Sequence, residues 1–236
     1  MSTKTEKAVL FLVEGDTDEQ SLAGVIRRYL APRHQRFQVI GTDITSDWDI
    51  NPKNILDRVN DEIHIALDKE KWFETDLSEV IQLVDMDGAY IDDRLIREEA
   101  TIPHWQYHED GMVAKSRDEA IKRNRHKVQN LDQLLTLTHV GKSATIPYRA
   151  FYFSCNLEHV LHNEPNVPDY EKREKADAFA DQYYDDVEGF VRFITKSSFC
   201  VLGSWEQTWN FIKEGNHSLQ RFTNFGLFFE KGGRGV

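Results

Sequence analysis

Apolar positions in the first part of the chain fall into short continuous runs that alternate with stretches of helical spacing. The run at 8–13, Ala-Val-Leu-Phe-Leu-Val, is short and mostly β-prone, which predicts a buried strand. Residues 14–16 interrupt it, and Thr17 with Gln20 then forms a capping-box pattern. An amphipathic helix that ends at Pro32 is predicted from the apolar stripe Leu22, Val25, Ile26 and Tyr29.

The same alternation continues to about residue 160. Further strands are predicted at 37–40, 80–84 and 149–154, and further helices from residue 51, over 118–137 and at 156–161. Residues 89–114 have no clean period and are expected to form an insertion. Strands that alternate with helices favour an α/β protein with a parallel sheet.

The last part of the chain is predicted to be mainly helical. Helices are expected over 170–195 and 205–214, and the aromatic residues from Trp205 to Phe229 are expected to be core. The best candidate boundary is 165–168, which has a proline at each end. We therefore expect a domain at 1–164 and a helical C-terminal extension, 165–236, packed on it.

Composition narrows the functional classes. The chain has 40 acidic and 29 basic residues, and its formal net charge of −11 argues against binding nucleic acid through bulk positive charge. The apolar run at 8–13 is far shorter than the roughly 20 residues that cross a bilayer. Two distant cysteines and a polar N-terminal segment without signal-peptide features lead us to expect a cytoplasmic protein with no membrane contact.

Carboxylates follow two of the predicted strands at the point where each strand ends. Glu14 follows the first strand, Asp85 and Asp87 follow the strand at 80–84, and Gly88 allows a sharp turn there. Asp18 lies one turn into the first helix. The carboxyl ends of parallel strands meet at one edge of a sheet. Such a group of hard oxygen ligands suits Mg²⁺.

Each motif alone also has an ordinary structural explanation. Val-Glu-Gly at 13–15 is common where a strand enters a turn, and Asp-x-Asp-Gly at 85–88 is common in turns. Asp18 can simply favour a helix N-terminus. The stronger signal is the pair of motifs in this order, each directly after a strand.

The pair of motifs resembles the Toprim domain. The residues that carry the resemblance are Val-Glu-Gly-Asp-Thr-Asp at 13–18 and Leu-Val-Asp-Met-Asp-Gly at 83–88. Toprim domains occur in topoisomerases, bacterial primases, OLD-family nucleases, a ribosomal RNA maturase and the RloB-like nuclease group. The resemblance covers about residues 7–162. It implies a Rossmann-type, four-stranded parallel sheet flanked by helices.

The resemblance also implies a metal site. Asp85 and Asp87 would be ligands of Mg²⁺ (or Mn²⁺), and Glu14 would be a general acid–base or a further ligand. Asp18 matches the additional acidic position that OLD-type enzymes use toward a second metal. Glu158 in Ser154-x-x-x-Glu158 is similar to the acidic residue after the fourth strand of the RloB-like group, although a solvated or capping glutamate explains it equally well.

A free-standing chain of this size is similar to the nuclease branches of the family. The resemblance therefore implies a Mg²⁺-dependent nuclease that hydrolyses phosphodiester bonds in nucleic acid, with a role in phage defence or mobile-element conflict. One alternative is an RNA-processing or transfer-RNA-cleaving Toprim ribonuclease. Another is a non-catalytic Toprim-like module that binds nucleic acid or a partner ATPase. The oligomeric state stays open, a homo-oligomer included.

A basic stretch lies on the predicted helix 118–137. Its residues would form a positive stripe that aligns a phosphate backbone, or equally a solvated helix face. Lys142 and Arg149 flank the fourth strand and would stabilise a phosphate. The nucleic-acid-binding candidates are Lys122, Arg123, Arg125, Lys127 and Lys142.

Overall fold

Five strands form the main sheet of the protein in a computed structural model, which describes residues 7–31, 35–39 and 43–230. The order across the sheet is β2 (Gln35–Val39), β1 (Ala8–Val13), β3 (Leu77–Asp85), β8 (Ile146–Phe153) and β7 (His139–Val140). The first four strands pair in parallel, and the short β7 runs antiparallel to β8. The predicted α/β class is confirmed, but the sheet is mixed rather than wholly parallel, because β7 is antiparallel to β8.

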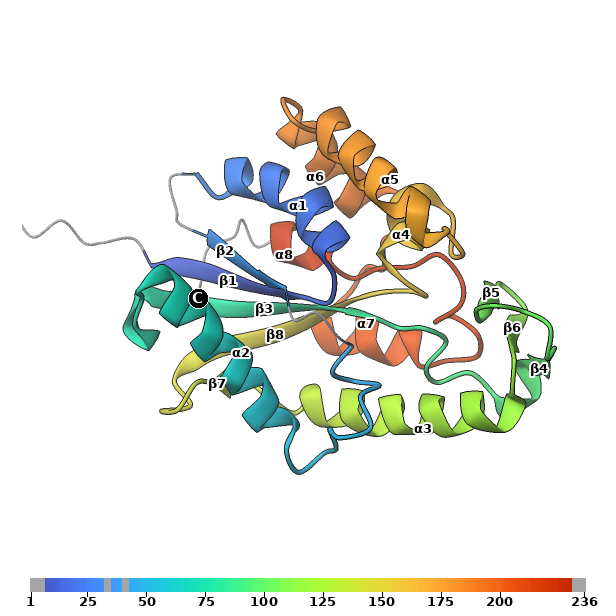
Figure 1. The fold of residues 1–236 in the computed structure, drawn as a ribbon. Helices are drawn as coiled ribbons and strands as arrows, with labels where there is room; N and C mark the ends of the chain where they lie inside the picture. Colours follow the sequence, from blue (N-terminus) through green and yellow to red (C-terminus); the bar gives the residue numbers. More distant parts are fainter. Residues whose placement is uncertain (1–6, 32–34, 40–42, 231–236) are drawn as a thin grey trace, which may run out of the picture.

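Helices cover both faces of this sheet (Figure 1). One face carries α1 (Asp16–Tyr29), α4 (Leu157–His162), α5 (Asp169–Gln182), α6 (Val187–Lys196) and α8 (Gly226–Glu230). The other carries α2 (Ile55–Glu70), α3 (Arg117–Leu134) and α7 (Trp205–Ile212). A strand between two helical layers must be apolar on both sides. This explains why β1 is an unbroken apolar run rather than an alternating one.

The packing of β1 shows the two layers directly. Leu10 and Leu12 belong to the core under α2, α3 and α7, while Val9, Phe11 and Val13 belong to the core under α1 and α8. All five side chains are fully buried. The two sets differ because side chains of a strand alternate between the faces of the sheet. The strand ends at Val13, so Glu14 lies at the carboxyl edge of the sheet.

The chain changes direction between β1 and β3. From β1 it passes through α1 to β2 on one side, and from β3 it passes through α3 to β8 on the other side. The topological switch point therefore lies between β1 and β3. In open α/β sheets, ligands bind beyond the carboxyl ends of the strands at such a point.

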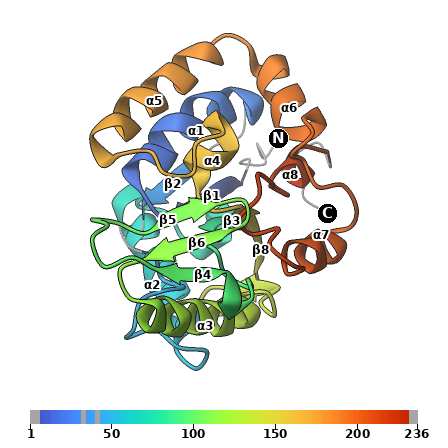
Figure 2. The same ribbon diagram turned by 90° about the vertical axis from the view of Figure 1, so that its right-hand side faces the viewer.

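Residues 89–114, expected as an insertion, contain a second small sheet. Its order is β4 (Ile96–Glu98), β6 (Gly111–Ala114) and β5 (Gln106–His108), preceded by the 3₁₀ turn η2 (Asp93–Leu95). A second 3₁₀ turn, η1 (Glu74–Asp76), precedes β3. The small sheet lies beyond the carboxyl ends of the main strands, next to α3 (Figures 1 and 2). It is therefore on the same side of the protein as the switch point.

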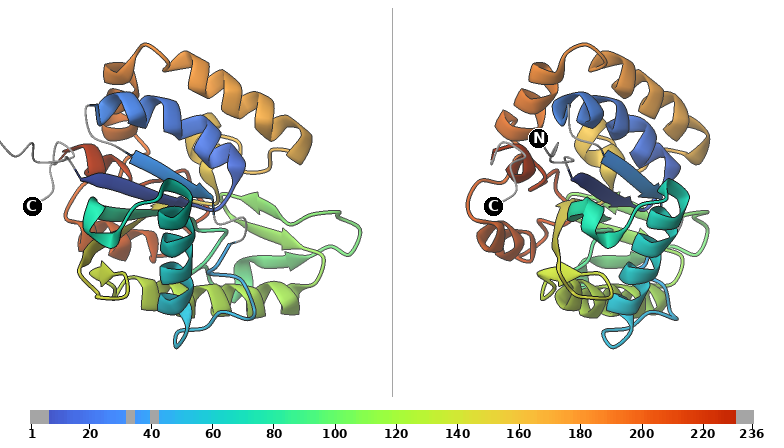
Figure 3. Two further views of the ribbon diagram at one scale, coloured as in Figure 1. Left: turned by 60° about the vertical axis from the view of Figure 1, so that its left-hand side comes forward. Right: turned by 90° about the vertical axis from the view of Figure 1, so that its left-hand side faces the viewer.

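The C-terminal extension packs into the same core as β1. The Phe228 ring lies 5.5 Å from that of Phe11, and the Phe225 ring lies 5.8 Å from that of Phe153. The helix predicted over 170–195 is broken at 183–186 into α5 and α6. Figure 3 shows α5 lying along α1 on the outer layer. The aromatic residues Trp209, Phe225 and Phe228 are buried, as predicted.

Among the helices that the structure describes, none is long and apolar enough to cross a membrane.

Candidate functional site

Carboxylates from three neighbouring strands meet at the carboxyl edge of the main sheet. Glu14 follows β1, Asp85 is the last residue of β3, and Glu158 lies in α4 directly after β8. These strands are adjacent, because β3 pairs with β1 on one side and with β8 on the other. Together with Asp18 and Asp87 these residues form what we call the acid cluster.

Asp85 lies at the centre of the acid cluster. Burial raises its pKa well above the ordinary value, and the negative charges of Glu14, Asp18, Asp87 and Glu158 raise it further. All five carboxylates are thus close enough to interact electrostatically. Within the described part of the chain the Asp85 side chain makes no hydrogen bond and no ion pair. The structure therefore brings the predicted carboxylates together, and the Lys172 ammonium, whose pKa the charge of Asp85 helps to raise, is a cation that interacts with Asp85 without forming an ion pair.

Glu14 is in a similar electrostatic environment. Its pKa is raised well above the ordinary value, chiefly by burial and then by the charge of Asp43, with Lys127 opposing the shift. The Oε1 atom of Glu14 is buried and has no hydrogen-bond partner among the described residues. A buried acceptor without a partner is costly, and native structures usually satisfy it with a protein group, water or an ion.

Asp18 lies in the first turn of α1 and also belongs to the acid cluster. Its Oδ2 atom accepts a hydrogen bond of 3.1 Å from the N–H of Gly15, so Asp18 and Gly15 cap the helix rather than the predicted Thr17 and Gln20. Burial raises the pKa of Asp18 to about 7, and the charge of Glu158 adds to the shift. Asp18 therefore lies at the helix N-terminus, as the structural alternative from the sequence held, and in the acid cluster at the same time.

Glu158 is buried rather than solvated. Its nearest cation is Lys172 of α5, whose Nζ lies 3.6 Å from Oε1. The cap of α4 comes from Asn156, whose Oδ1 accepts a 2.9 Å hydrogen bond from the N–H of His159. The alternative that Glu158 is a solvated or capping residue is therefore wrong.

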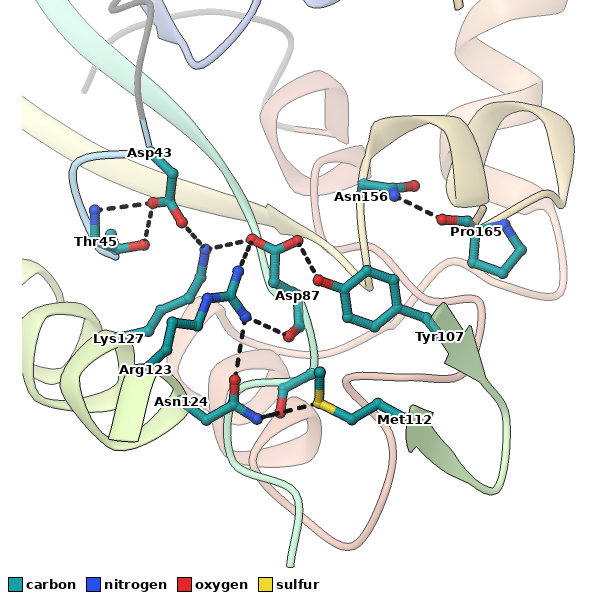
Figure 4. Close-up of polar contacts among 11 residues, drawn as sticks. Asp43, Thr45, Asp87, Tyr107, Met112, Arg123, Asn124, Lys127, Asn156 and Pro165 are labelled. Atoms are coloured by element: carbon teal, nitrogen blue, oxygen red, sulfur yellow. Dashed lines mark hydrogen bonds and ion pairs between the residues drawn. The ribbon is translucent and has the colours of Figure 1, made fainter. Parts of the chain in front are cut away.

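Asp87 has two close cationic partners (Figure 4). Its Oδ2 lies 2.8 Å from Lys127 Nζ and 2.8 Å from an Arg123 guanidinium nitrogen, and the Tyr107 hydroxyl donates to Oδ1 at 3.2 Å. Burial alone would raise the pKa of Asp87, but Lys127 and Arg123 outweigh it and lower that pKa. Asp87 is therefore charged and held in place by protein groups.

Asp43 completes this ion-pair network, and sequence reasoning missed it. It follows β2, and its carboxylate pairs with Lys127 and accepts a 2.8 Å hydrogen bond from the N–H of Thr45. Burial opposes ionisation, but Lys127 lowers the pKa of Asp43 well below its usual range. The available signal was an acidic residue shortly after a predicted strand, as for Glu14 and Asp85.

The basic stripe predicted on α3 is not a single exposed surface. Lys127 has an exposed fraction of 0% and lies inside the Asp43–Asp87 network, and Arg123 is largely buried against Asp87. Arg125 is exposed and pairs with Asp93 at 2.6 Å. The expectation is corrected for Lys127 and Arg123 because buried carboxylates from distant segments bind them. Lys122 remains an exposed lysine of α3.

Lys142 lies at the opposite edge of the sheet from the acid cluster, whereas Arg149 lies in the middle of β8. Lys142 lies in the turn before β8, and Arg149 pairs with Glu79 near the beginning of β3 at 2.9 Å. In the pairing of β3 with β8, Arg149 lies opposite Ile81, four residues before the pair formed by Asp85 and Phe153. Lys142 therefore lies away from the acid cluster and Arg149 is bound to Glu79, and the phosphate contact expected for the two residues stays a prediction.

Across residues 7–31, 35–39 and 43–230, no three or more His, Cys, Asp or Glu side chains are arranged as a ready metal-ligand group. Comparison of the chain with protein-family models, with curated proteins and with solved structures gave no match.

Proposed function

We propose that this protein is a Mg²⁺- or Mn²⁺-dependent nuclease of Toprim type that hydrolyses phosphodiester bonds in nucleic acid. The observation that carries the proposal is the meeting of Glu14 and Asp85 at the switch point between β1 and β3, where both have raised pKa values and the Asp85 side chain makes no hydrogen bond or ion pair among the described residues. A divalent ion between such carboxylates would offset their repulsion and burial.

The residues present fit such an ion. The unpartnered Oε1 of Glu14 is an oxygen donor, and the Asp85 carboxylate beside it is another. Mg²⁺ prefers hard oxygen ligands and usually keeps several waters, so one or two carboxylates suffice to hold it. A pre-assembled group of three side chains is therefore not required. Asp18 and Glu158 are the further donors that we assign to this site.

Strand order supports the Toprim assignment. Four parallel strands in the order β2-β1-β3-β8 carry Glu14 after the first strand and Asp85 with Asp87 after the central one. The turn at Glu14-Gly15 leads directly into α1. These are the positions that the resemblance implies for the Toprim motifs.

A bound divalent ion would polarise the scissile phosphate and lower the pKa of a water. The protein's own residues have separate tasks. Glu14 would act either as a ligand, through its unpartnered Oε1 atom, or as the general acid–base. Lys127 and Arg123 hold Asp87 in one position, and Asp87 orients Tyr107 toward the same edge. The resemblance alone adds a role in phage defence or mobile-element conflict to the proposal.

The experiment is cleavage of end-labelled DNA and RNA by the purified protein with Mn²⁺ or Mg²⁺. We expect cleavage that EDTA abolishes and that Glu14→Ala and Asp85→Asn each reduce at least about 100-fold, as for loss of an essential acid–base or ligand. Asp110→Asn removes an exposed carboxylate outside the acid cluster and serves as the control. Cleavage of RNA alone would select the ribonuclease alternative. Full activity of Asp85→Asn would reject the proposal.

A further inference from the structure

A cavity of about 270 Å³ opens beside the acid cluster. It is lined by Trp48, Trp105, Glu119, Lys122 and Arg123. Trp48 comes from the loop after β2, Trp105 directly precedes β5 of the small sheet, and the other three come from α3. Its volume is close to the lower end of small-ligand pockets, about 300 Å³. The three elements that form it all lie at the carboxyl side of the main sheet.

Both tryptophans are supported from behind by α3. The Trp48 ring lies 4.9 Å from the His126 ring at an interplanar angle of 32°, and His126 in turn contacts the carbonyl oxygen of Asp47 at 2.8 Å. The Trp105 ring lies 5.0 Å from the Arg123 guanidinium. Trp48 nevertheless remains 63% exposed. Such a large exposed indole, held in place and lining a cavity, is typical of a binding surface.

Arg123 connects this cavity to the acid cluster. The same guanidinium lies against the Trp105 ring and 2.8 Å from Asp87 Oδ2. A ligand in the cavity is therefore one side chain away from Asp87, a member of the acid cluster. The exposed Lys122 on the cavity wall supplies a positive charge in a protein whose net charge is −11.

We infer that this cavity binds an unpaired nucleobase of the nucleic acid substrate, with the indoles of Trp48 and Trp105 as stacking surfaces and Lys122 beside the adjoining phosphate. The inference rests on the proposed function and specifies its substrate class. Aromatic rings combined with cations are the means by which proteins bind single strands, because every base has a π-face. A paired base inside a duplex cannot enter the cavity, so single strands, flaps or loops are the preferred substrates.

The test is the affinity of fluorescein-labelled oligothymidylate and oligouridylate, measured by anisotropy in EDTA so that no cleavage occurs. Trp48→Ala and Trp105→Ala should each weaken binding roughly 5- to 150-fold, which corresponds to about 1–3 kcal/mol of stacking per base. Lys122→Gln should reduce the salt dependence of binding. Phe73→Ala is the matched control, because Phe73 is 74% exposed and lies before β3 at the opposite edge of the sheet.

Two substrates sharpen the test. A blunt duplex of equal length should bind more weakly than the single strand, and an abasic strand should bind the wild type as weakly as the intact strand binds Trp48→Ala. Trp48 is mostly exposed, so its replacement leaves the fold intact even if Trp105→Ala is unstable. Unchanged affinity of Trp48→Ala for the single strand would overturn the inference.

The inference and the proposed function fail separately. If the tryptophan variants bind and cleave like the wild type while Asp85→Asn is inactive, the cavity assignment is wrong and the nuclease stands. If the wild type neither binds divalent ions nor cleaves, but binds single strands through Trp48, the nuclease is wrong. The protein would then be a binding module whose cavity assignment holds.

Discussion

The Nζ atom of Lys127 lies 2.8 Å from Oδ2 of Asp87, with the lysine side chain fully buried. The same ammonium pairs with Asp43, and the second cation on Asp87 is Arg123. Two carboxylates at the edge of the sheet are thus neutralised by the protein itself. The pKa values of Glu14, Asp85 and Asp18 rise instead, chiefly because of burial and also because of their negative neighbours.

Replacing Lys127 tests whether the protein's own cation stabilises the carboxylates of Asp43 and Asp87. Lys127→Met should lower the free energy of unfolding by about 3–5 kcal/mol, because it leaves two poorly solvated carboxylates without their cation. Urea denaturation measures the change. Lys122→Met is the control on the same helix, and its exposed lysine should matter by less than about 0.5 kcal/mol. Equal effects of the two variants would show that the Asp43–Lys127–Asp87 network is not important for stability.

The raised pKa of Asp18 makes the stability of the protein depend on pH when divalent ions are chelated. Its folded-state pKa of about 7 exceeds the ordinary 3.8, so the folded protein binds a proton more tightly than the unfolded chain. This contribution is complete below about pH 3.8 and is lost as the pH rises through about 7. The melting temperature should therefore fall between about pH 5 and 8.

Asp18→Asn isolates that contribution, because asparagine keeps an oxygen that can accept from the N–H of Gly15 but does not ionise. Its melting temperature should fall less steeply than that of the wild type over the same range. Identical slopes in thermal melts with EDTA would contradict the raised pKa of Asp18.

The C-terminal helices should unfold together with the main sheet. Phe228→Ala should cost about 3–5 kcal/mol, because Phe228 is fully buried against Phe11 of β1. Phe73→Ala, at an exposed position, should have little effect. Urea unfolding followed by tryptophan fluorescence and by circular dichroism should give one coincident transition. Two separate transitions would instead make the extension an independent unit.

Much of the fold follows from local pattern. The continuous apolar run predicted β1, and the helical stripe Leu22, Val25, Ile26 and Tyr29 predicted α1, because burial on two faces or along one stripe leaves a clear pattern of apolar residues. Residues 89–114 left no such signal, since β4, β5 and β6 have only three or four residues each. A strand that short cannot establish an alternation.

The site was predictable in part. Glu14 and Asp85 could be placed together because carboxyl ends of parallel strands meet at one edge. The burial of Lys127 could not be predicted from the sequence, because a lysine among basic neighbours on α3 suggests solvent exposure. Its partners Asp43 and Asp87 are distant in sequence, and only the fold brings them to it. Trp48 and Trp105 were missed for the same reason, since separate loops place them on one cavity.

Isothermal titration of the purified protein with Mn²⁺ tests the acid cluster most directly. The wild type should bind the ion, Asp85→Asn and Glu14→Gln should lose at least about tenfold in affinity, and Asp110→Asn should bind like the wild type. A wild-type protein that binds no divalent ion, or an Asp85→Asn variant that binds it unchanged, would contradict the account.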